Sequence, residues 1–486
     1  MEKGKSQIRN IIYVYNKIPL PVKASVWFVF CSVIQKGIAF FTTPIFTRMM
    51  TTEEFGIVSV YNSWSSILTV VLTLQLATGV FNKSMIKYEN DKDAYTSSML
   101  FLTSLMILVG LLVFIVFKDY LNPIIGMDFK LTIALFIDLL FSQAMTFWTV
   151  RNRFEYQYKN IIFFTLVSTV LSTFGSILAI CILPDNKVYA RVYTMVFTHI
   201  IIYSYIYYKI FHAGKKYIWF SAWKYAIKYN IPLIPHYLSQ QVLNQADRLM
   251  INNMCGNDAT AVYTVAYQLA MVLNIITTAI ESSFTPWSFT KISHGKGNEV
   301  GKIAQIILII TGVVCLFFTL MAPEFIYILG GKSYERAIWV VPPVCMSVYF
   351  IMMYSLISTI TFYYERTKLI MAASCIIAIL NIILNKFFIN VFGMVAAGYT
   401  TLICYVCYAL IHYLLMTKVC INENIQNPFN IYMIWIPAII FVILAILSSI
   451  VYKHYILRLV LIVFFAILLF TIIYRNKKEL YNIIAK

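Results

Sequence analysis

Polar and ionisable side chains lie inside long apolar stretches of this sequence, and they are the side chains best suited to bind or carry a ligand. Lys36 shares one face of a helix with Ser32, Thr43 and Thr47, because these residues recur at spacings of 4, 7 and 4. A charge at this depth in a membrane is costly unless it faces a water-filled cavity or a partner. We therefore interpret Lys36 as a cation in an aqueous cavity, with pairing inside a helix bundle as the alternative.

The most polar of these stretches covers residues 231–252, where amide, carboxylate and guanidinium groups recur at helical spacing. Residues 260–285 and the earlier residues 57–81 repeat the pattern with amides and hydroxyls. The simplest interpretation is that these polar faces line one shared aqueous cavity. The alternative is that they hold the helices together, as small polar residues do in membrane proteins. The candidate cavity-lining and headgroup-binding residues are Lys36, Arg48, Asn62, Gln240, Asn244, Arg248, Gln268 and Asn274.

Three carboxylates in the apolar stretches are candidates for carrying a coupling cation. Asp138 stands alone in the run LTIALFIDLLFSQ, so we expect it to lack a partner and to carry a proton or another cation. Asp247 lies near one end of its stretch, where an ion pair with Arg248 is the alternative. Glu281 also lies near a helix end, where simple solvation is the alternative. We predict no metal site, no catalytic residue and no cofactor apart from a coupling proton or sodium ion.

The composition indicates a helical membrane protein. Of the 486 residues, 60% are apolar and 12% are charged, against about 25% charged in soluble domains. The net charge is +18, but the basic residues form short clusters between apolar runs, which excludes nucleic-acid binding. The nine cysteines lie mostly in apolar runs, which argues against disulfides or a zinc site. His199 and His412 lack a carboxylate or second histidine at metal-ligand spacing, so we expect them to pack within the bundle.

Fourteen stretches are long and apolar enough to cross a bilayer, which takes about 20 residues each. If alternate connections face the same side, 26 Lys and Arg residues fall on the side of the N-terminus and nine on the other. Basic residues accumulate in cytoplasmic loops, so we expect both termini in the cytoplasm. The predicted spans are 24–47, 57–81, 96–117, 131–150, 161–183, 192–211, 231–252, 260–285, 303–323, 337–362, 369–391, 395–416, 431–452 and 456–474.

The sequence resembles itself at an interval of about 205 residues. FGIVSVYNSW matches TAVYTVAYQL, NPIIG matches YILGG, and NRFEYQYKN matches YYERTK, in the same order. Two halves with six spans each have the same orientation and are related by an axis along the membrane normal. The predicted parts are a cytoplasmic leader at 1–23, an N-lobe of six helices at 24–211, a cytoplasmic linker at 212–230, a C-lobe of six helices at 231–418, a helix pair at 431–474 and a cytoplasmic tail at 475–486.

Two segments carry a family resemblance. PIFTRMMTTEEFGIVSVYN, residues 44–62, resembles the first-helix signature of the polysaccharide-unit (Wzx-type) flippases of the MOP superfamily, which are relatives of the MATE exporters and the lipid II flippases. IPLIPHYLSQQVLNQADRLMINNMCGNDATAVYTVAYQLA, residues 231–270, is similar to the second-half signature of that family and includes the dipeptide Asp247-Arg248. The resemblance in the order of spans covers essentially the whole chain.

The resemblance implies an alternating-access flippase with two lobes around a V-shaped cavity. Its substrate would be an undecaprenyl-pyrophosphate-linked oligosaccharide repeat unit, moved from the inner to the outer leaflet of a bacterial plasma membrane under an inward gradient of protons or sodium ions. Lys36, Arg48 and Arg248 would meet the anionic headgroup. A polysaccharide polymerase and its assembly machinery would be partners, and the last helix pair would guide the lipid tail.

Two other functions stay open. A MATE-like exporter of drugs or cations would have a cavity rich in carboxylates and aromatic residues, and Lys36 and the extra helix pair count against it. A membrane glycosyltransferase or polymerase would place its chemistry in a long polar loop, but the outer connections near 118–130 and 324–336 have only about thirteen residues each. We therefore expect that the protein is not an enzyme.

Overall fold

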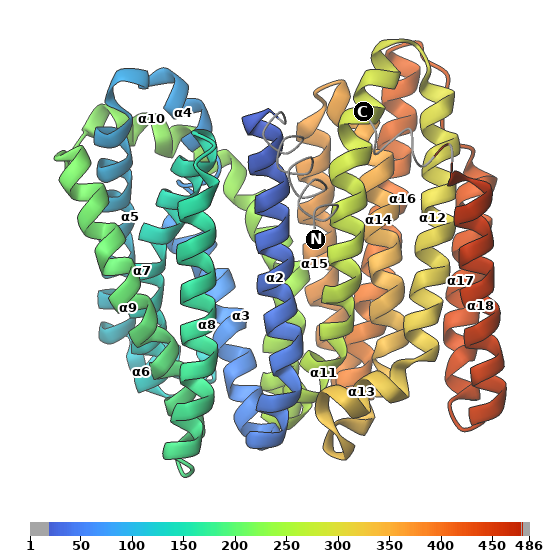
Figure 1. Ribbon diagram of the computed structural model, residues 1–486, viewed down its shortest axis with the longest axis horizontal. Helices are drawn as coiled ribbons and strands as arrows, with labels where there is room; N and C mark the ends of the chain where they lie inside the picture. Colours follow the sequence, from blue (N-terminus) through green and yellow to red (C-terminus); the bar gives the residue numbers. More distant parts are fainter. Residues whose placement is uncertain (1–18, 478, 480–486) are drawn as a thin grey trace, which may run out of the picture. The chain divides into compact units, whose positions relative to one another are not determined.

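The computed structural model describes residues 19–477 and residue 479, so most of the predicted leader and tail lies outside the described residues. The described residues form helices and no strand (Figure 1). This confirms the predicted all-helical membrane fold, in which each helix satisfies its own backbone groups. The longer helices are α2 (Leu20–Met49), α3 (Thr52–Thr73), α5 (Lys92–Val116), α7 (Phe129–Phe154), α8 (Tyr158–Ile182), α9 (Lys187–Gly214), α11 (Ile234–Ser293), α12 (Gly297–Leu320), α14 (Val341–Tyr363), α15 (Thr367–Phe392), α16 (Met394–Asn422), α17 (Ile431–Val451) and α18 (Tyr455–Arg475).

Shorter helices connect these elements at their ends. They are α4 (Phe81–Lys87), α6 (Lys118–Ile125), α10 (Phe220–Asn230) and α13 (Ala322–Gly330), together with the 3-10 turns η1 (Glu89–Asp91), η2 (Ile231–Leu233) and η3 (Lys332–Trp339).

Twelve helical stretches in the described part of the chain are long and apolar enough to cross a membrane. Every predicted span overlaps a helix, although 57–81 runs past the end of α3 at Thr73. The count of twelve differs from fourteen for two reasons. One stretch runs over residues 220–293 and includes the predicted spans 231–252 and 260–285. The predicted span 192–211 lies on α9, which is not among the twelve because its tyrosines and histidine lower its mean hydropathy.

The two predicted spans inside α11 are separated by a break in the helix at Gly256. The backbone there has φ 88° and ψ 178°, a conformation that glycine adopts readily and other residues do not. Helical hydrogen bonding is interrupted at this residue, so α11 consists of one helical segment before Gly256 and a second after it.

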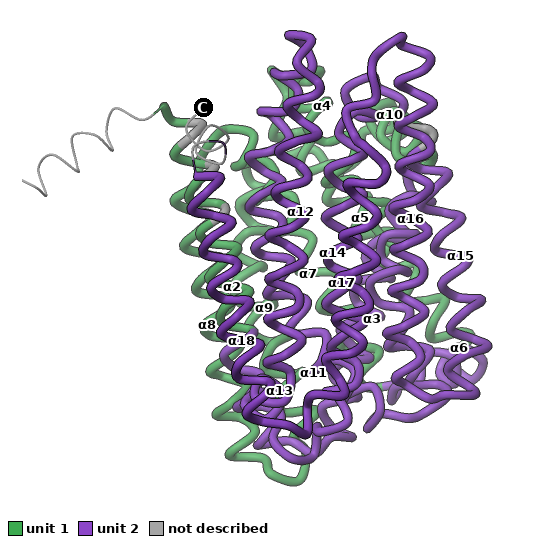
Figure 2. The backbone as a smooth tube through the Cα atoms, turned by 90° about the vertical axis from the view of Figure 1, so that its right-hand side faces the viewer, with its two compact units in different colours: residues 1–39, 72–118, 130–232 green, residues 40–71, 119–129, 233–486 purple. Residues whose placement is uncertain are grey.

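The chain divides into two compact units, coloured separately in Figure 2. Unit 1 comprises the described residues up to 39 and residues 72–118 and 130–232. Within it α9 packs against α5 and α8. Its core is aromatic and tightly buried, with Phe81 against Tyr95 and Phe147. The bounds of the two lobes predicted from the repeat stay a prediction.

Unit 2 comprises residues 40–71, 119–129 and 233–486. Here α14 packs against α16, while α11 contacts α14, α15 and α16. The last two helices pack on α12, and α18 buries one side chain, Arg458, which pairs with Glu324 of α13. The remaining surface of α18 is apolar and exposed, as expected for a helix that faces lipid.

Within unit 2, Gly56 allows α3 to lie directly against α11. A Cβ atom at Gly56 would lie 2.0 Å from the carbonyl oxygen of Asn257. On the same side of α3, the Thr52 hydroxyl donates to the Asp258 carboxylate. The close approach therefore depends on the absence of a side chain at this position.

We expect Gly56→Ala to lower the free energy of unfolding by about 1–3 kcal/mol, because the methyl group forces α3 away from α11. Gly37→Ala on α2 is the matched control, since nothing lies within 4 Å of its Cβ position. Melting temperatures of the purified proteins in one detergent measure the difference. Equal melting of the two variants would contradict the packing described for Gly56.

Candidate functional site

The most deeply buried charged group among the predicted site residues is the carboxylate of Asp247 on α11, which is 1% exposed. It accepts three hydrogen bonds, from the Tyr263 hydroxyl (2.6 Å), the Asn385 amide (2.7 Å) and the Thr401 hydroxyl (2.7 Å). These donors come from the second segment of α11, from α15 and from α16. A buried carboxylate is stable only with such partners, so Asp247 holds three helices together.

A second layer of polar side chains surrounds this carboxylate. Asn385, which is itself fully buried, accepts a hydrogen bond from the Thr400 hydroxyl. Its amide also lies 3.3 Å from the Asn381 carbonyl oxygen, and the Asn381 amide lies 3.3 Å from the Thr401 hydroxyl. We call Asp247, Asn381, Asn385, Thr400 and Thr401 the Asp247 cluster.

The Asp247 cluster contains carboxylate, amide and hydroxyl oxygens, and the Cys404 thiol hydrogen-bonds with the Asn381 side chain beside it. Such oxygens are the ligands of hard cations, and a carboxylate in this setting also accepts a proton. Among the described residues, no group of three or more His, Cys, Asp or Glu side chains is placed to hold a metal ion.

Arg248 follows Asp247 in sequence, but the two side chains form no salt bridge with each other in the described part of the chain. The buried Arg248 guanidinium donates to the Asn244 carbonyl oxygen and to Gln245, both at 2.8 Å, and lies 4.5 Å from the ring centre of Tyr267. The expected alternative of an Asp247–Arg248 ion pair is therefore not observed. Instead, a chain of contacts from Arg248 through Gln245 reaches Ser63 of α3 at 3.3 Å.

Arg48 lies at the end of α2 and caps α13. Its guanidinium donates to the carbonyl oxygens of Ile328 (2.9 Å) and Tyr327 (3.3 Å) near the last turn of that helix. A cation is favoured there because the carbonyl groups of the last turn carry a partial negative charge. Arg48 thus has a structural role and remains exposed.

The other predicted cavity residues differ in their exposure. Asn62 is exposed on α3, while Gln240, Asn244, Gln268 and Asn274 are half-buried on α11. Gln240 hydrogen-bonds with the Tyr408 side chain of α16. Together with Arg48 and Arg248, these residues belong to unit 2, so the structure brings most of the predicted set into one unit.

Glu281 is also in unit 2, toward the end of α11, and its carboxylate hydrogen-bonds with the Ser355 side chain. It lies away from the Asp247 cluster in sequence and shares no contact with it in the described residues.

Two predicted residues belong to unit 1. Lys36 is exposed on α2. Asp138 on α7 is not alone, because its carboxylate lies 2.6 Å from Nδ1 of His199 on α9. The expectation that Asp138 lacks a partner is wrong, whereas His199 lies within the helix bundle as expected. These two residues lie on different helices, α7 and α9, and spacing along the sequence cannot reveal such a pairing.

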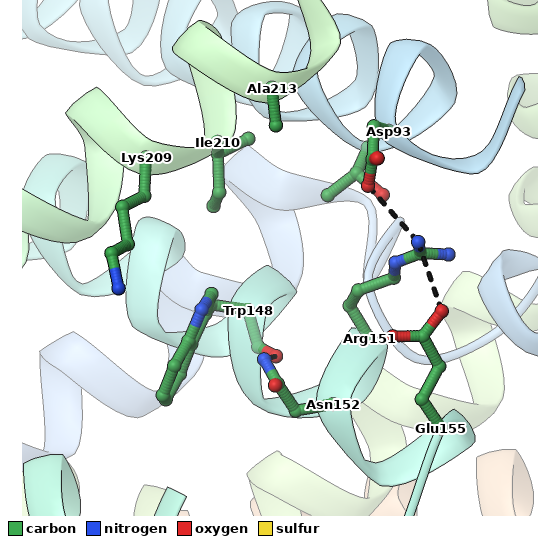
Figure 3. A pocket seen from close by; sticks show the side chains of 9 residues that line it. Asp93, Trp148, Arg151, Asn152, Glu155, Lys209, Ile210 and Ala213 are labelled. Carbon is green, nitrogen blue, oxygen red and sulfur yellow. Dashed lines mark hydrogen bonds and ion pairs between the residues drawn. The ribbon is translucent and has the colours of Figure 1, made fainter. Parts of the chain in front are cut away.

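Unit 1 also contains two polar pockets. The first, of about 390 Å³, lies at the ends of α5, α7 and α9. Figure 3 shows the Arg151 guanidinium between Asp93 and Glu155, 3.0 Å from each carboxylate, with Lys209 on the opposite side of the pocket. The second, of about 340 Å³, is lined by α2, α7, α8 and α9. Neither pocket was predicted from the sequence.

Sequence reasoning missed most of the Asp247 cluster. Asn381 and Asn385 are four residues apart in the apolar run AILNIILNKFF, so both lie on one face of α15. Thr400 and Thr401 are hydroxyls in an otherwise apolar helix, where they are common and carry little information. The amide pair was therefore the available signal, and only the fold shows that it meets Asp247.

The family model for polysaccharide biosynthesis proteins matches residues 22–292, which is more than half of the chain. The chain belongs to the polysaccharide biosynthesis protein family. A second family model, MatE, matches residues 232–387. The chain is also similar to a protein of the Lsg locus of Haemophilus influenzae, with 22% identity over 382 residues that cover 74% of this chain and 89% of that protein.

Solved structures of transporters share the fold. The chain is similar to the lipid II flippase MurJ in an inward closed conformation, with a TM-score of 0.64 at 15% identity over 89% of this chain and 100% of that chain. It is also similar to an inward-facing multidrug resistance MATE family transporter of the MOP superfamily, with a TM-score of 0.60 at 12% identity over 81% and 96%. At identities this low the similarity shows a shared fold. Membership of the family comes from the match of the family model. The chain is a multi-pass membrane protein of the polysaccharide biosynthesis protein family, which confirms the family resemblance expected from the sequence.

We expect Asn385→Ala to lower the free energy of unfolding by about 1–3 kcal/mol, because it removes one of the three donors to the buried Asp247 carboxylate and the side-chain acceptor of the Thr400 hydroxyl. Asn390→Ala on the same helix is the control, since the exposed Asn390 donates to a backbone carbonyl oxygen of its own helix. Thermal melting of the two purified variants beside the unmodified protein tests this. A loss of similar size in both would show that the Asp247 cluster contributes little to stability.

Proposed function

We propose that the protein is a flippase that moves an undecaprenyl-pyrophosphate-linked oligosaccharide repeat unit from the inner to the outer leaflet of a bacterial plasma membrane. The observation that carries this proposal is the match of the polysaccharide biosynthesis family over residues 22–292, in a chain that has a transporter fold. In this proposal both termini lie in the cytoplasm, a cation gradient drives alternating access, and a polysaccharide polymerase takes up the exported unit.

Physical reasoning supports the same substrate class. A glycan attached to a pyrophosphate cannot cross hydrocarbon unaided, but polar helix faces can hold it while its polyprenyl tail stays in lipid. Amides and a guanidinium lie along α11 at helical spacing, and Arg248 is held with its charge unpaired by any carboxylate of residues 19–477.

Deletion of the encoding gene tests the proposal directly. We expect loss of a surface polysaccharide and accumulation of lipid-linked repeat units on the inner leaflet, because the units are made but not moved. Mass spectrometry of extracted lipids, combined with accessibility of the glycan to an external glycosidase, measures both effects. Normal surface polysaccharide in the deletion strain would refute the proposal, and restoration by the unmodified gene is the control.

We further propose that the coupling cation, a proton or a sodium ion, binds at the Asp247 cluster and not at Asp138 or Glu281. The cluster offers several oxygens around one buried carboxylate. In the part of the chain that the structure describes, Asp138 and Glu281 each have a single polar partner, His199 and Ser355, and neither lies in a comparable group of amide and hydroxyl side chains from several helices.

We expect Asp247→Asn to reduce export about 5- to 150-fold at unchanged membrane abundance, since the neutral amide no longer balances a cation. Asp258→Asn is the control, because Asp258 lies on the same helix but is exposed. Export is measured in cells that carry each variant, with sodium replaced by potassium at fixed pH in one series. Undiminished export by Asp247→Asn would place coupling elsewhere.

The alternative is a MATE-like exporter of drugs or cations, which the match of the MatE model to residues 232–387 favours. Increased drug sensitivity of the deletion strain, with unaltered surface polysaccharide, would select that function instead.

A further inference from the structure

The second pocket of unit 1 has a polar lining with a single sign of charge. It has a volume of about 340 Å³, which is within the range of pockets that enclose a small ligand and too small for an oligosaccharide. Among the described residues that line it, Arg153 is the charged one. Side chains that matter for its chemistry are Phe28, Gln35, Thr149, Arg153, Ser168 and Tyr203.

The two arginines near the end of α7 differ in what surrounds them. Arg151 is neutralised by Asp93 and Glu155 in the neighbouring pocket (Figure 3). Arg153 is exposed, its guanidinium lies 5.2 Å from the ring centre of Phe28, and no carboxylate of residues 19–477 pairs with it. The first guanidinium is therefore already satisfied, whereas the second is available to an anion.

The hydroxyl groups in this pocket are prepared to accept hydrogen bonds. Ser32 donates to the Phe28 carbonyl oxygen, Thr146 to that of Ser142 and Ser168 to that of Thr165, each at 3.0 Å. Because each proton is used within its own helix, the Ser32 and Thr146 oxygens remain as acceptors, whereas the Ser168 hydroxyl also hydrogen-bonds with the Tyr203 side chain. Acceptors of this kind suit a ligand that brings many hydroxyl donors.

Aromatic rings complete the lining. Phe28 and Tyr203 offer apolar faces beside the hydroxyl groups. A sugar has hydroxyl donors around its edge and C–H groups on its faces, and a phosphate brings the anion that one guanidinium binds strongly.

We propose that this pocket binds the sugar phosphate end of a lipid-linked substrate, with Arg153 on the phosphate and the hydroxyl-lined wall on the first sugar. The inference rests on the proposed function for the source of the ligand, whereas the phosphate chemistry comes from the pocket itself. Arg153 lies in the last turn of α7, on the side of the membrane that the distribution of basic residues predicts to be cytoplasmic. The pocket is thus a place where the substrate first binds from the inner leaflet.

Binding to the purified full-length protein tests the inference without an export assay. Undecaprenyl phosphate and undecaprenol share a tail and differ in the phosphate, so the difference between their affinities, measured by native mass spectrometry, reports phosphate recognition. We expect undecaprenyl phosphate to bind more tightly, and Arg153→Gln to weaken its binding about tenfold or more because a charge-assisted hydrogen bond is lost.

Two further variants separate this role from a general effect on folding. Arg151→Gln removes a guanidinium two residues away, outside the pocket, and we expect it to leave phosphate binding within about twofold. Arg153→Lys keeps the charge but loses the planar guanidinium, so we expect its phosphate binding to lie between that of the unmodified protein and that of Arg153→Gln. Membrane abundance and melting temperature of each variant are measured alongside.

Equal affinity for undecaprenol and undecaprenyl phosphate would overturn the inference, as would equal losses in Arg153→Gln and Arg151→Gln. Competition by glucose 1-phosphate would support phosphate recognition with a soluble sugar phosphate as the source, and resistance to it would support the lipid-linked source. If the deletion strain exports polysaccharide normally while Arg153→Gln still loses phosphate binding, the pocket stands and the flippase assignment fails. If instead the protein is required for export and Arg153→Gln binds phosphate normally, the flippase assignment stands and the inference about the pocket fails.

Discussion

A carboxylate that is removed from water needs hydrogen-bond donors, and in this molecule that requirement shapes the middle of unit 2. Asp247 is 1% exposed, and an uncompensated charge at such a position would cost more than the protein's stability allows. Donors from α15, α16 and the second segment of α11 meet it. The packing of these helices therefore brings together the donors that the buried carboxylate needs.

The same requirement explains the contrast within unit 1. Arg151 lies beside two carboxylates and is held by them, while Arg153 rests against an aromatic ring and hydroxyl groups. Both residues lie in the same turn of α7 and have the same chemistry, so their surroundings alone distinguish them. A guanidinium without a carboxylate partner keeps its affinity for anions.

Much of the fold could be predicted from the sequence because lipid imposes a simple rule: a long apolar run becomes a helix. Every span predicted in this way overlaps a helix, and residues 231–285 were identified as the most polar part of the membrane region. That rule does not predict which residues of different helices contact each other. Asp138 was expected to be alone, yet His199 lies 61 residues away and 2.6 Å from it, and Asn385 could not be connected with Asp247 by spacing alone. Periodicity describes one helix at a time, whereas a site is made by several.

The break at Gly256 gives α11 a joint between the residue that holds the charge and one of the residues that neutralises it. Asp247 precedes this joint and Tyr263 follows it, and their hydrogen bond spans the interruption. A continuous helix transmits rotation along its whole length, but a helix with an interruption transmits it only through whatever bridges the gap. In the longest helix described here, the Asp247–Tyr263 hydrogen bond therefore links the two segments across the interruption, in addition to their packing on the neighbouring helices.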